Sequence, residues 1–405
     1  MSEHIANFKN FAKLKDTDIA FNDITVIAGK PSTGKSYVMK FMYAIDETIS
    51  SILDGSYRVH YVLDDTNIIH KLRPLRILLS RTQNIIIHDI NTLIDNHKYR
   101  EALDIFNLKN LTIKDDDLYL KEFKNILGKL VIKQEKALTQ TDKEKFHFIF
   151  RNILESIFGS IEQINHNFSY KNEFIDIEYI SNTLKVNKLK LQKEVTSATF
   201  VETPLILEFE KFLPKEKFKT PYHIDSLLQE LNQSDFSFTS DETSEFINKF
   251  RTASSQIING NISKGSQGFS FESKGKSYNI INTSSGTKSI GLLQYLVTNK
   301  ALKKGSVLYW EEPEVHLHPQ WQLKMVELFV ELMNAGIKII FSTHSPYMAD
   351  YLNAISKKRK FDERISFNLF KEEALVKNII LDEKTWDLLQ DELLGTLEDI
   401  VWEYL

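Results

Sequence analysis

Short apolar runs alternate along the chain with longer segments in which apolar residues have helical spacing. Near its start, "FAKL", "DIAF" and "ITVIAG" predict strands, and "SYVMKFMYAIDETISSIL" predicts a helix directly after them. Strand patterning returns in residues 268–281, which predict a hairpin turning at Lys274 and Gly275. Apolar strands are also predicted at "SVLYW" and "KIIF". The two ends of the chain therefore predict an α/β fold.

The middle of the chain has a different composition. Residues 76–250 are rich in Lys, Glu, Asn, Leu and Ile, are nearly free of Gly and Pro, and show helical spacing in "LYLKEFKNILGKLVI" and "FHFIFRNILESIFGSIEQI". No strict heptad lasts long enough for an extended coiled coil, so the expected arm is short. We predict residues 1–75 and 251–405 as two parts of one α/β domain, with residues 76–250 as a mostly helical insertion.

The segment "GKPSTGKS", residues 29–36, lies between a predicted strand and a predicted helix and is called the phosphate loop below. The pattern G-x-x-x-x-G-K-[ST] places inward-turned amides and a positive helix end around an anion. The Lys35 ammonium can reach the β- and γ-phosphates, and the Ser36 hydroxyl can complete a Mg²⁺ shell. The alternative is a lysine-bearing turn without a ligand. We predict binding of ATP and Mg²⁺ through Gly29, Lys30, Pro31, Ser32, Thr33, Gly34, Lys35, Ser36 and Tyr37.

Two adjacent acids, Glu311 and Glu312, end the strand "SVLYW". Neighbouring side chains on a strand face opposite sides, so one acid can hold Mg²⁺ or its water while the next polarises the attacking water. His344 follows the strand "KIIF", where its ring can donate a hydrogen bond to a γ-phosphate oxygen. The alternatives are a solvent-facing acidic loop and a structural histidine.

A small, amide-rich loop opens the predicted helix "SIGLLQYLV". It consists of Ser284, Ser285, Gly286 and Thr287, and it is called the signature loop below. Backbone donors and a hydroxyl at a helix N-terminus can meet an anion. An ordinary helix cap is the favoured interpretation of this loop in isolation. Its order along the chain, after the phosphate loop and before the two acids, favours a nucleotide contact.

Composition narrows the class of protein. With 42% apolar and 26% charged residues among 405, the chain can bury a substantial core. It has no cysteine, which excludes disulfides, cysteine-ligated zinc and thiol nucleophiles. No apolar run approaches the roughly 18 residues of a membrane span, and the N-terminus lacks the order of a secretory signal. We therefore expect a cytoplasmic protein without membrane contact.

The net charge of −4 argues against a uniformly basic nucleic-acid coat. Two local basic stretches remain, "SKKRK" at residues 356–360 and the spaced lysines of "LKVNKLKLQKEV". Either stretch could serve a nucleic acid, although a solvated face is the favoured interpretation.

Taken together, the phosphate loop, the insertion, "SSGTK", "VLYWEEPE" with "HLHP", and "STHSPY" resemble ABC-type ATPases of the SMC and OLD-like class. They are similar in particular to the AAA-family ATPases of anti-phage systems such as Septu, certain retrons and PARIS. The resemblance covers about residues 1–50 and 255–375, together with "FVETPLIL" near residue 200. It implies a P-loop ABC-type ATPase head that forms a head-to-tail dimer or a larger assembly.

The resemblance also implies roles for single residues. Lys35 and Ser36 would bind phosphates and Mg²⁺, Glu312 would be the catalytic base for hydrolysis of ATP to ADP and phosphate, and His344 would be the γ-phosphate switch. Ser284 and Gly286 would reach the γ-phosphate of a partner chain. His316 and His318 stand where the D-loop region of the family begins.

Two departures from the family pattern matter. The residue before the catalytic Glu is usually Asp, whereas Glu311 is one methylene longer, so we expect slow hydrolysis with Glu311 as the metal acid. The glutamine of the Mg²⁺ shell is assigned to Gln83 in "SRTQNIII", and Gln134 lies too deep in the helical region.

Two functions follow from the resemblance. The first is an ATPase sensor and scaffold that holds a separately encoded effector, expected to be a nuclease, and releases or activates it on infection. The second is a DNA-repair ATPase that clamps DNA when ATP closes the dimer. Because the chain ends about 60 residues past His344, we expect no nuclease domain of the OLD type within it. Its limited size and the lack of long coiled coils favour the first function.

Overall fold

The computed structural model describes residues 4–56, 90, 93, 99–108, 118–191, 195–209, 220–232, 241–265, 268–371, 376–379 and 386–393. The chain divides into two compact units, one made of residues 1–50 and 153–405 and the other of residues 51–152. The phosphate loop, the signature loop, the two acids and His344 all belong to the first unit.

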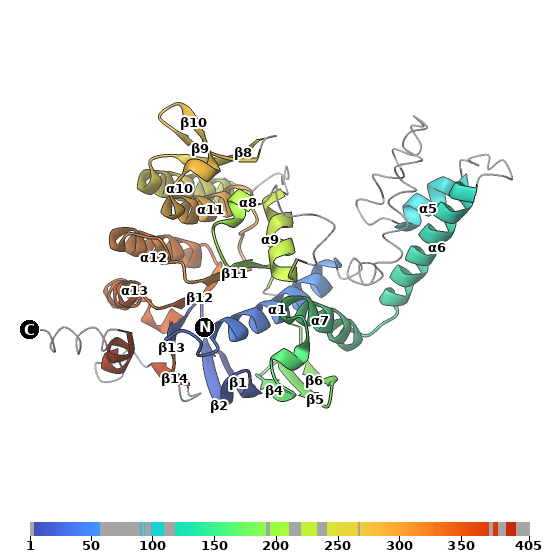
Figure 1. The fold of residues 1–405 in the computed structure, drawn as a ribbon, viewed down its shortest axis with the longest axis horizontal. Coiled ribbons are helices and arrows are strands. Elements are labelled where there is room, and N and C mark those ends of the chain that lie inside the picture. Colours follow the sequence, from blue (N-terminus) through green and yellow to red (C-terminus); the bar gives the residue numbers. More distant parts are fainter. Residues whose placement is uncertain are drawn as a thin grey trace, which may run out of the picture. The chain divides into compact units, whose positions relative to one another are not determined.

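A six-stranded sheet lies at the centre of the first unit (Figure 1). Its order is β14-β13-β3-β12-β11-β7, with β3 (Ile24–Gly29), β7 (Ser197–Val201), β11 (Ser306–Glu311), β12 (Lys338–Thr343), β13 (Ile365–Phe370) and β14 (Val376–Ile379). All neighbouring pairs are parallel except β13 with β14. The strands β3 and β13 are buried along their whole length, as expected for a parallel sheet covered on both faces. The carboxyl ends of β3, β11 and β12 therefore meet at one edge, which carries the candidate side chains.

Helices cover one face of this sheet and share a hydrophobic core with it. They are α8 (Ile206–Phe209), α9 (Tyr222–Asn232), α10 (Asp241–Ile258), α11 (Ser285–Thr298), α12 (Pro319–Asn334) and α13 (Pro346–Arg359). Trp310 of β11, Phe341 of β12 and Phe329 of α12 are buried in this core. His318 and Ser345 cap the first turns of α12 and α13 through their side chains. The loops that follow β11 and β12 are thus held between a buried strand and a capped helix.

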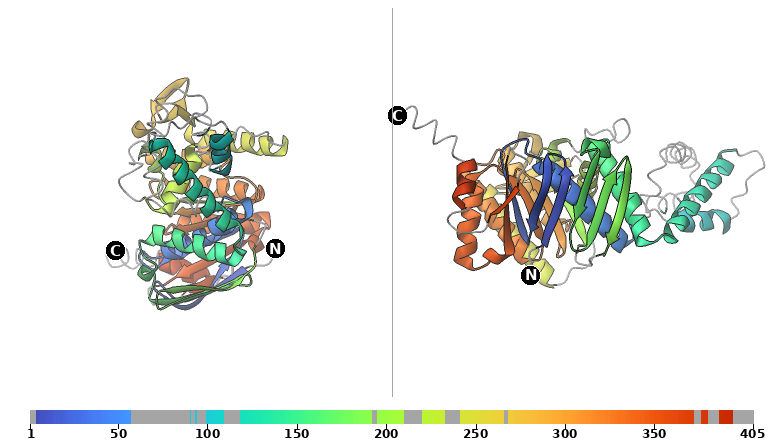
Figure 2. Two further views of the ribbon diagram at one scale, coloured as in Figure 1. Left: turned by 90° about the vertical axis from the view of Figure 1, so that its right-hand side faces the viewer. Right: turned by 90° about the horizontal axis from the view of Figure 1, so that it is seen from below.

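The phosphate-loop helix, α1 (Lys35–Asp54), lies between the central sheet and a second, antiparallel sheet. The order of the second sheet is β2-β1-β4-β5-β6, with β1 (His4–Phe11), β2 (Leu14–Phe21), β4 (Asn167–Lys171), β5 (Ile175–Ile180) and β6 (Thr183–Leu189), and its strands lie side by side in the right-hand view of Figure 2. Phe41 of α1 packs on Phe8 of β1, with ring centroids 6.0 Å apart. Two residues later, Tyr43 packs on Tyr309 of β11 at the same centroid distance, 6.0 Å. Because α1 is apolar toward both sheets, it is buried from two sides.

A third sheet contains the predicted hairpin. It consists of β8 (Asn261–Gly265), β9 (Gly268–Ser273) and β10 (Lys276–Asn279) in the order β10-β9-β8. The turn between β9 and β10 has left-handed backbone angles, with φ +50° at Lys274 and +73° at Gly275. The hairpin predicted for residues 268–281 is therefore confirmed. Short 3₁₀ turns complete the first unit at η1 (Ile161–Gln163), η2 (Ile280–Asn282) and η3 (Asp362–Arg364).

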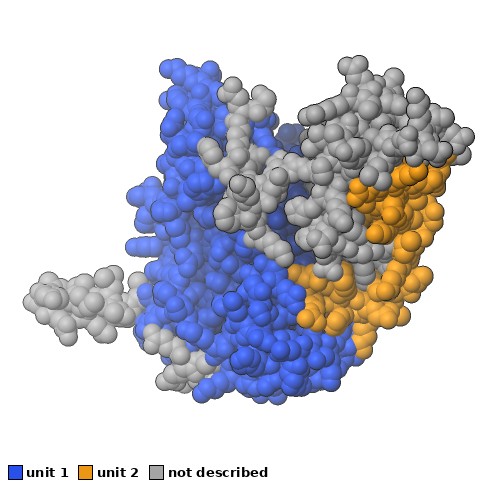
Figure 3. Space-filling view, turned by 45° about the vertical axis from the view of Figure 1, so that its right-hand side comes forward, with its two compact units in different colours: residues 1–50, 153–405 blue, residues 51–152 orange. Residues whose placement is uncertain are grey.

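The described residues of the second unit, which is coloured orange in Figure 3, are mostly helical. It contains α5 (Tyr99–Leu108), α6 (Leu118–Leu138) and the first part of α7 (Asp142–Phe158). Phe123 and Leu130 of α6 are buried. None of the helices in the described ranges is long and apolar enough to cross a membrane.

The expected mostly helical insertion of residues 76–250 differs from the structure after α7. Residues 167–189 form β4, β5 and β6 of the antiparallel sheet, and β7 is an edge strand of the central sheet. The signal was a period of two in the apolar residues of "NFSYKNEFIDIEYISNTLKV", because Phe168 and Tyr170, like Ile175 and Ile177, are buried in alternation. Frequent charged residues and few glycines made this region look helical by composition alone.

Candidate active site

The phosphate loop has a backbone that only glycine permits at its first position. Gly29 has φ +133°, and a Cβ atom there would lie 2.1 Å from the carbonyl oxygen of Phe370 in β13. Gly34 has φ +102°, and α1 begins at the next residue. Because β3 ends and α1 begins within this loop, the helix N-terminus points its free amide groups toward the loop.

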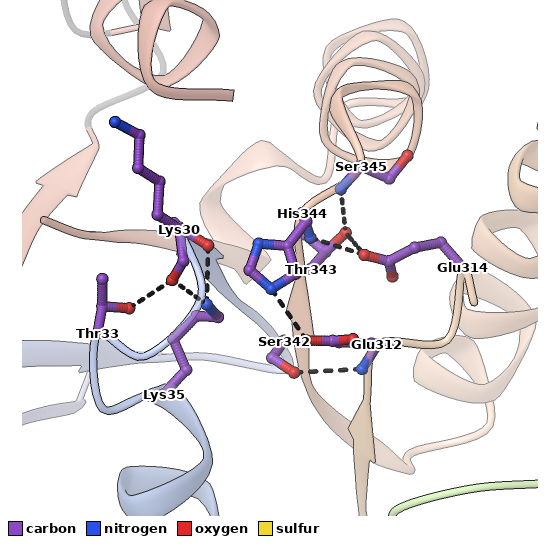
Figure 4. Close-up of polar contacts among 10 residues, drawn as sticks. Lys30, Thr33, Lys35, Glu312, Glu314, Ser342, Thr343, His344 and Ser345 are labelled. Carbon is purple, nitrogen blue, oxygen red and sulfur yellow. Dashed lines mark hydrogen bonds and ion pairs between the residues drawn. The ribbon is translucent and has the colours of Figure 1, made fainter. Parts of the chain in front are cut away.

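Lys35 folds back into this loop (Figure 4). Its Nζ donates hydrogen bonds to the carbonyl oxygens of Gly29 and Lys30, both at 2.7 Å. Burial lowers the pKa of Lys35 to about 8, although the nearby charges of Glu312, Glu314 and Glu311 raise it. The ammonium group is therefore held inside a loop that is able to surround an anion.

The lowered pKa of Lys35 predicts a proton linkage. In the free protein, Lys35 loses its proton as the pH rises through about 8, whereas a bound polyphosphate favours the charged form. We expect ATP binding to take up about half a proton per site near pH 8 and to weaken as the pH rises further. Titration calorimetry in two buffers with different ionisation enthalpies measures this uptake. Binding at pH 8 to 9 without proton uptake would contradict the assignment.

The two adjacent acids have different neighbours. Glu311 accepts a hydrogen bond from Ser36 of the phosphate loop and lies near Lys40 of α1. Burial raises the pKa of Glu311 despite these two groups, and its Oε1 is buried without a hydrogen-bond partner in the described part of the chain. Glu312 has a left-handed φ of +46°, and its backbone N–H donates to Ser342 Oγ at 3.2 Å. The Glu312 side chain extends toward the His344 ring (Figure 4).

His344 joins Glu312 to the phosphate loop. His344 Nε2 lies 2.9 Å from Glu312 Oε1, and both side chains are partly accessible to solvent. Burial and then the Lys35 charge lower the pKa of His344, whereas Glu312 and a hydrogen bond with the Gly29 backbone raise it. The structure therefore brings together three groups that sequence analysis selected separately: Lys35, Glu312 and His344.

Glu314 is a residue that sequence analysis did not select. Its Oε1 accepts hydrogen bonds from the His344 backbone N–H at 2.6 Å and from Thr343 Oγ1 at 2.9 Å (Figure 4). Burial raises the pKa of Glu314, and its Oε2 is buried without a partner among the described residues. Glu314 thus holds the loop that carries His344. The only sequence signal was a second acid two residues after Glu312.

Replacing Glu314 by glutamine tests this positioning. The amide offers one acceptor oxygen, and its NH₂ group would face the His344 and Thr343 donors if it were turned. Hydrogen bonds to a charged acceptor contribute about 1.5–3 kcal/mol and those to a neutral acceptor about 0.5–1.5 kcal/mol, so weakening both bonds to Glu314 Oε1 is expected to lower turnover by about tenfold, with ATP affinity nearly unchanged. Steady-state kinetics of Glu314→Gln beside Glu331→Gln, an acid on α12 that pairs with Lys249 at 3.0 Å, would measure this. Equal turnover in the two variants would contradict the role.

Glu202 is a fourth acid at this edge. It follows β7, the parallel neighbour of β11 in which Val201 pairs with Trp310. Its carboxylate lies 2.9 Å from Lys40 Nζ and 3.0 Å from His223 Nε2. The hydrogen bond from His223 and, to a smaller extent, Lys40 lower the pKa of Glu202 to about 2, although burial opposes this shift. The charge of Glu202 in turn raises the pKa of Glu311. The sequence contained a signal for Glu202, because "FVETP" resembles "YWEEP": in both, an apolar strand ends in an acid two residues before a proline.

The signature loop has contacts of its own. Ser284 caps α11 by accepting from the Thr287 backbone N–H at 3.2 Å, and the hydroxyls of Ser284 and Thr287 lie 2.8 Å apart. A Cβ atom on Gly286 would lie 3.2 Å from the His316 carbonyl oxygen and 3.4 Å from the Trp321 ring, so the loop packs closely on the segment after β11. Among the described residues, no side chain of this loop bonds to the phosphate loop of the same chain.

The residues present fit a Mg²⁺ ion. Magnesium prefers oxygen ligands and is usually held by one or two carboxylates together with substrate phosphates. The Ser36 hydroxyl hydrogen-bonds to the Glu311 carboxylate, and the Oε1 atom of that carboxylate has no partner among the described residues, so these two side chains offer oxygen ligands at one place. In the described ranges, no cluster of three or more His, Cys, Asp or Glu forms a metal site that would be independent of a nucleotide. Gln83, the predicted glutamine ligand, lies outside the described residues.

Comparison with known proteins gives one family. The model of the AAA ATPase domain family matches residues 5–349. The retron Vc95 probable ATPase of Vibrio cholerae serotype O1 biovar El Tor is 23% identical over 379 residues, covering 84% of this chain and 69% of that protein. Among solved structures, the SMC head domain from Thermotoga maritima matches with 11% identity and a TM-score of 0.42, covering 94% of this chain and all of that one. The ATP-binding cassette MJ1267 of an ABC transporter matches with 12% identity and a TM-score of 0.36, covering 96% of each chain.

Proposed function

Because the chain belongs to the AAA ATPase domain family, whose model matches residues 5–349, we propose that it is an ATP-switched sensor and scaffold of an anti-phage defence complex. The similarity to a retron probable ATPase supports the placement in defence. The observation that carries the switch is the 2.9 Å contact between His344 Nε2 and Glu312 Oε1, next to the loop that holds Lys35. A γ-phosphate held by Lys35 offers His344 a second acceptor, so phosphate and Glu312 compete for the same imidazole.

The proposed reaction is hydrolysis of ATP by water. The water oxygen attacks the γ-phosphorus, the bond to the β-phosphate oxygen breaks, and Glu312 accepts the proton of the water. Lys35 offsets negative charge on the phosphates, and Glu314 holds the backbone of His344 in place. Mg²⁺, when bound by Ser36 and Glu311, neutralises charge on the β- and γ-phosphates.

We propose that ATP stays bound for a long time before it is hydrolysed. Glu311 stands where the family usually has Asp, and its carboxylate is one methylene farther from the backbone than that of the usual metal acid. Slow loss of the γ-phosphate would keep the ATP-bound state as a lasting signal. Measuring steady-state hydrolysis beside dimer lifetime tests this, because turnover of many ATP per second would exclude a timed switch.

The signature loop is proposed to complete the site of a partner chain in a head-to-tail dimer. Its first residue, Ser284, is exposed, whereas Gly286 and Thr287 are buried against their own chain. The loop therefore presents one end to the surroundings and is anchored at the other. Two sites would then form between two chains, each from one phosphate loop and one signature loop.

Ser284→Arg tests the dimer. The long cation at this exposed cap would block a partner chain, so we expect ATP binding by the monomer to persist while ATP-dependent dimerisation and hydrolysis are lost. Calorimetry measures ATP binding, and light scattering with and without ATP measures dimerisation. Release of phosphate measures hydrolysis. The matched control is Ser277→Arg, on the exposed strand β10. Normal dimerisation and turnover in Ser284→Arg would contradict the head-to-tail arrangement.

The proposed partner is a separately encoded effector, for which a nuclease is the expected class. Copurification of the chain with the product of a neighbouring gene, with and without ATP, tests the scaffold. An effector that binds in one nucleotide state and leaves or becomes active in the other supports it. Binding that is unaffected by nucleotide in both wild type and Glu312→Gln would contradict switching.

The exposed end of α13 favours a second candidate function, a DNA clamp. Lys357, Lys358 and Arg359 fill its last turn, and Lys360 follows in a left-handed conformation. Cationic side chains of this kind bind phosphate backbones with a steep salt dependence. ATP-dependent DNA retention that is lost in Lys357→Glu/Lys358→Glu would favour the clamp over the scaffold.

A further inference from the structure

A cavity of about 180 Å³ lies beside the middle of α1, between the two sheets that enclose this helix. Met42, Ile45 and Ile49 of α1 line it, together with Phe21, Ile175 and Ile340 from strands of both sheets. A water molecule needs only about 10–15 Å³ of such space. The cavity therefore has room for a small organic molecule with an apolar body.

Asp46 of α1 lies on the wall of this cavity, whose lining also includes the acids Asp23 and Glu173. Its Oδ2 accepts a hydrogen bond of 2.6 Å from the Tyr309 hydroxyl of β11. Asp46 is surrounded by protein atoms but keeps part of its surface accessible, as expected for a side chain that borders a cavity. Burial raises its pKa to about 6, and the Tyr309 bond and the charge of Lys338 only partly oppose this. A carboxylate in these surroundings is stabilised by an added positive charge.

We propose that this cavity binds a small organic cation, an alkyl or aryl ammonium ion whose nitrogen pairs with Asp46 and whose hydrocarbon part fills the apolar space. Two of the other charged groups on its lining already have partners. Asp23 pairs with Arg364 at 2.7 Å, and Lys190 lies over the Phe174 ring at 5.8 Å. The remaining titratable groups of the lining are His4, Tyr170, Glu173 and Lys338.

The place of Asp46 connects this cavity to the nucleotide site. Asp46 belongs to the same helix as Lys35, and Tyr309 stands two residues before Glu311 on β11. The Asp46–Tyr309 bond therefore links the phosphate-loop helix to the strand that ends in the acids. A cation that pairs with Asp46 acts on this link, so we expect it to change ATP affinity. This last expectation rests on the proposed function, whereas cation binding does not.

Binding of benzylammonium to the nucleotide-free full chain tests the proposal directly. Titration calorimetry at a pH above the Asp46 pKa is expected to show binding of benzylammonium and at least about tenfold weaker binding of neutral benzyl alcohol, since a bond to a charged group is lost. Asp46→Asn keeps an acceptor for Tyr309 and should lower the affinity for benzylammonium by a similar factor. The control, Asp362→Asn on the exposed turn η3, should leave it unchanged.

A second variant locates the site. Ala6 of β1 lines the cavity and is buried, so Ala6→Leu fills part of the space and should weaken binding of both ligands. Circular dichroism and thermal melting show whether each variant is folded. Absence of benzylammonium binding to the wild type, or unchanged affinity in folded Asp46→Asn or in folded Ala6→Leu, would overturn the proposal. Since no nucleotide is present, this result is independent of whether ATP is hydrolysed.

Discussion

Glu312→Gln is expected to lower ATP turnover by a factor on the order of 10² to 10⁴ while leaving ATP bound. Glutamine keeps the shape of the side chain but cannot accept the proton of the attacking water. Its amide oxygen can still accept from His344 Nε2, which lies 2.9 Å from Glu312 Oε1 in the wild type. The variant should therefore remain folded, bind ATP and accumulate in the ATP-bound dimer.

Single-turnover hydrolysis and the dimer lifetime, measured in the same samples, check this expectation. Glu331→Gln provides the matched control, because this acid pairs with Lys249 on the surface of α12. If Glu312→Gln and the control hydrolyse ATP at the same rate, Glu312 is not the base that accepts the proton of the attacking water.

Glu311 should behave differently, because it faces Ser36 and not His344. A metal acid affects binding as well as rate, so Glu311→Gln should weaken Mg²⁺·ATP itself, and Glu311→Asp should be tolerated or even faster. ATP affinity measured with and without Mg²⁺ separates the two acids. Equal losses of binding in Glu311→Gln and Glu312→Gln would show that they do not have separate roles.

Lys35→Ala is expected to lower ATP affinity by about 100-fold or more. Each charge-assisted hydrogen bond contributes about 1.5–3 kcal/mol, and the ammonium of Lys35 would make more than one with the phosphates. Among the residues that the structure describes, this ammonium donates hydrogen bonds only to the loop carbonyls of Gly29 and Lys30. We therefore expect the loss to appear in nucleotide binding and much less in folding.

Lys30→Ala is a sharp control, since it removes a second lysine side chain from the same loop but keeps the Lys30 backbone, whose carbonyl oxygen accepts from Lys35 Nζ at 2.7 Å. The Lys30 ammonium lies 3.7 Å from Glu392, and its side chain is 42% exposed. Its removal should change ATP affinity severalfold at most. Calorimetry on both variants, with thermal melting to confirm folding, measures the contrast. Unchanged nucleotide affinity in Lys35→Ala would exclude the phosphate loop as the nucleotide site.

Local sequence determined the parts of this protein whose shape depends on neighbouring residues. The phosphate loop could be predicted from the sequence, because its two glycines, lysine and serine occur at a fixed spacing between one strand and the helix that follows it. The hairpin at Lys274 and Gly275 could also be predicted, because the positive φ angles of its turn depend on the residues of the turn itself. The alternation of side chains on a strand likewise predicted different surroundings for Glu311 and Glu312.

The tertiary structure alone decided which distant groups meet. Residues 167–189 join the sheet of the N-terminal strands, although helical segments separate them in the chain, because buried apolar faces pair without regard to sequence distance. For the same reason, Glu202 reaches the edge that carries Glu311, and Glu314 holds the backbone of a histidine 30 residues away. Burial then sets the pKa of Lys35, Asp46 and Glu311. Desolvation depends on all the atoms packed around a charge, which a linear pattern does not specify.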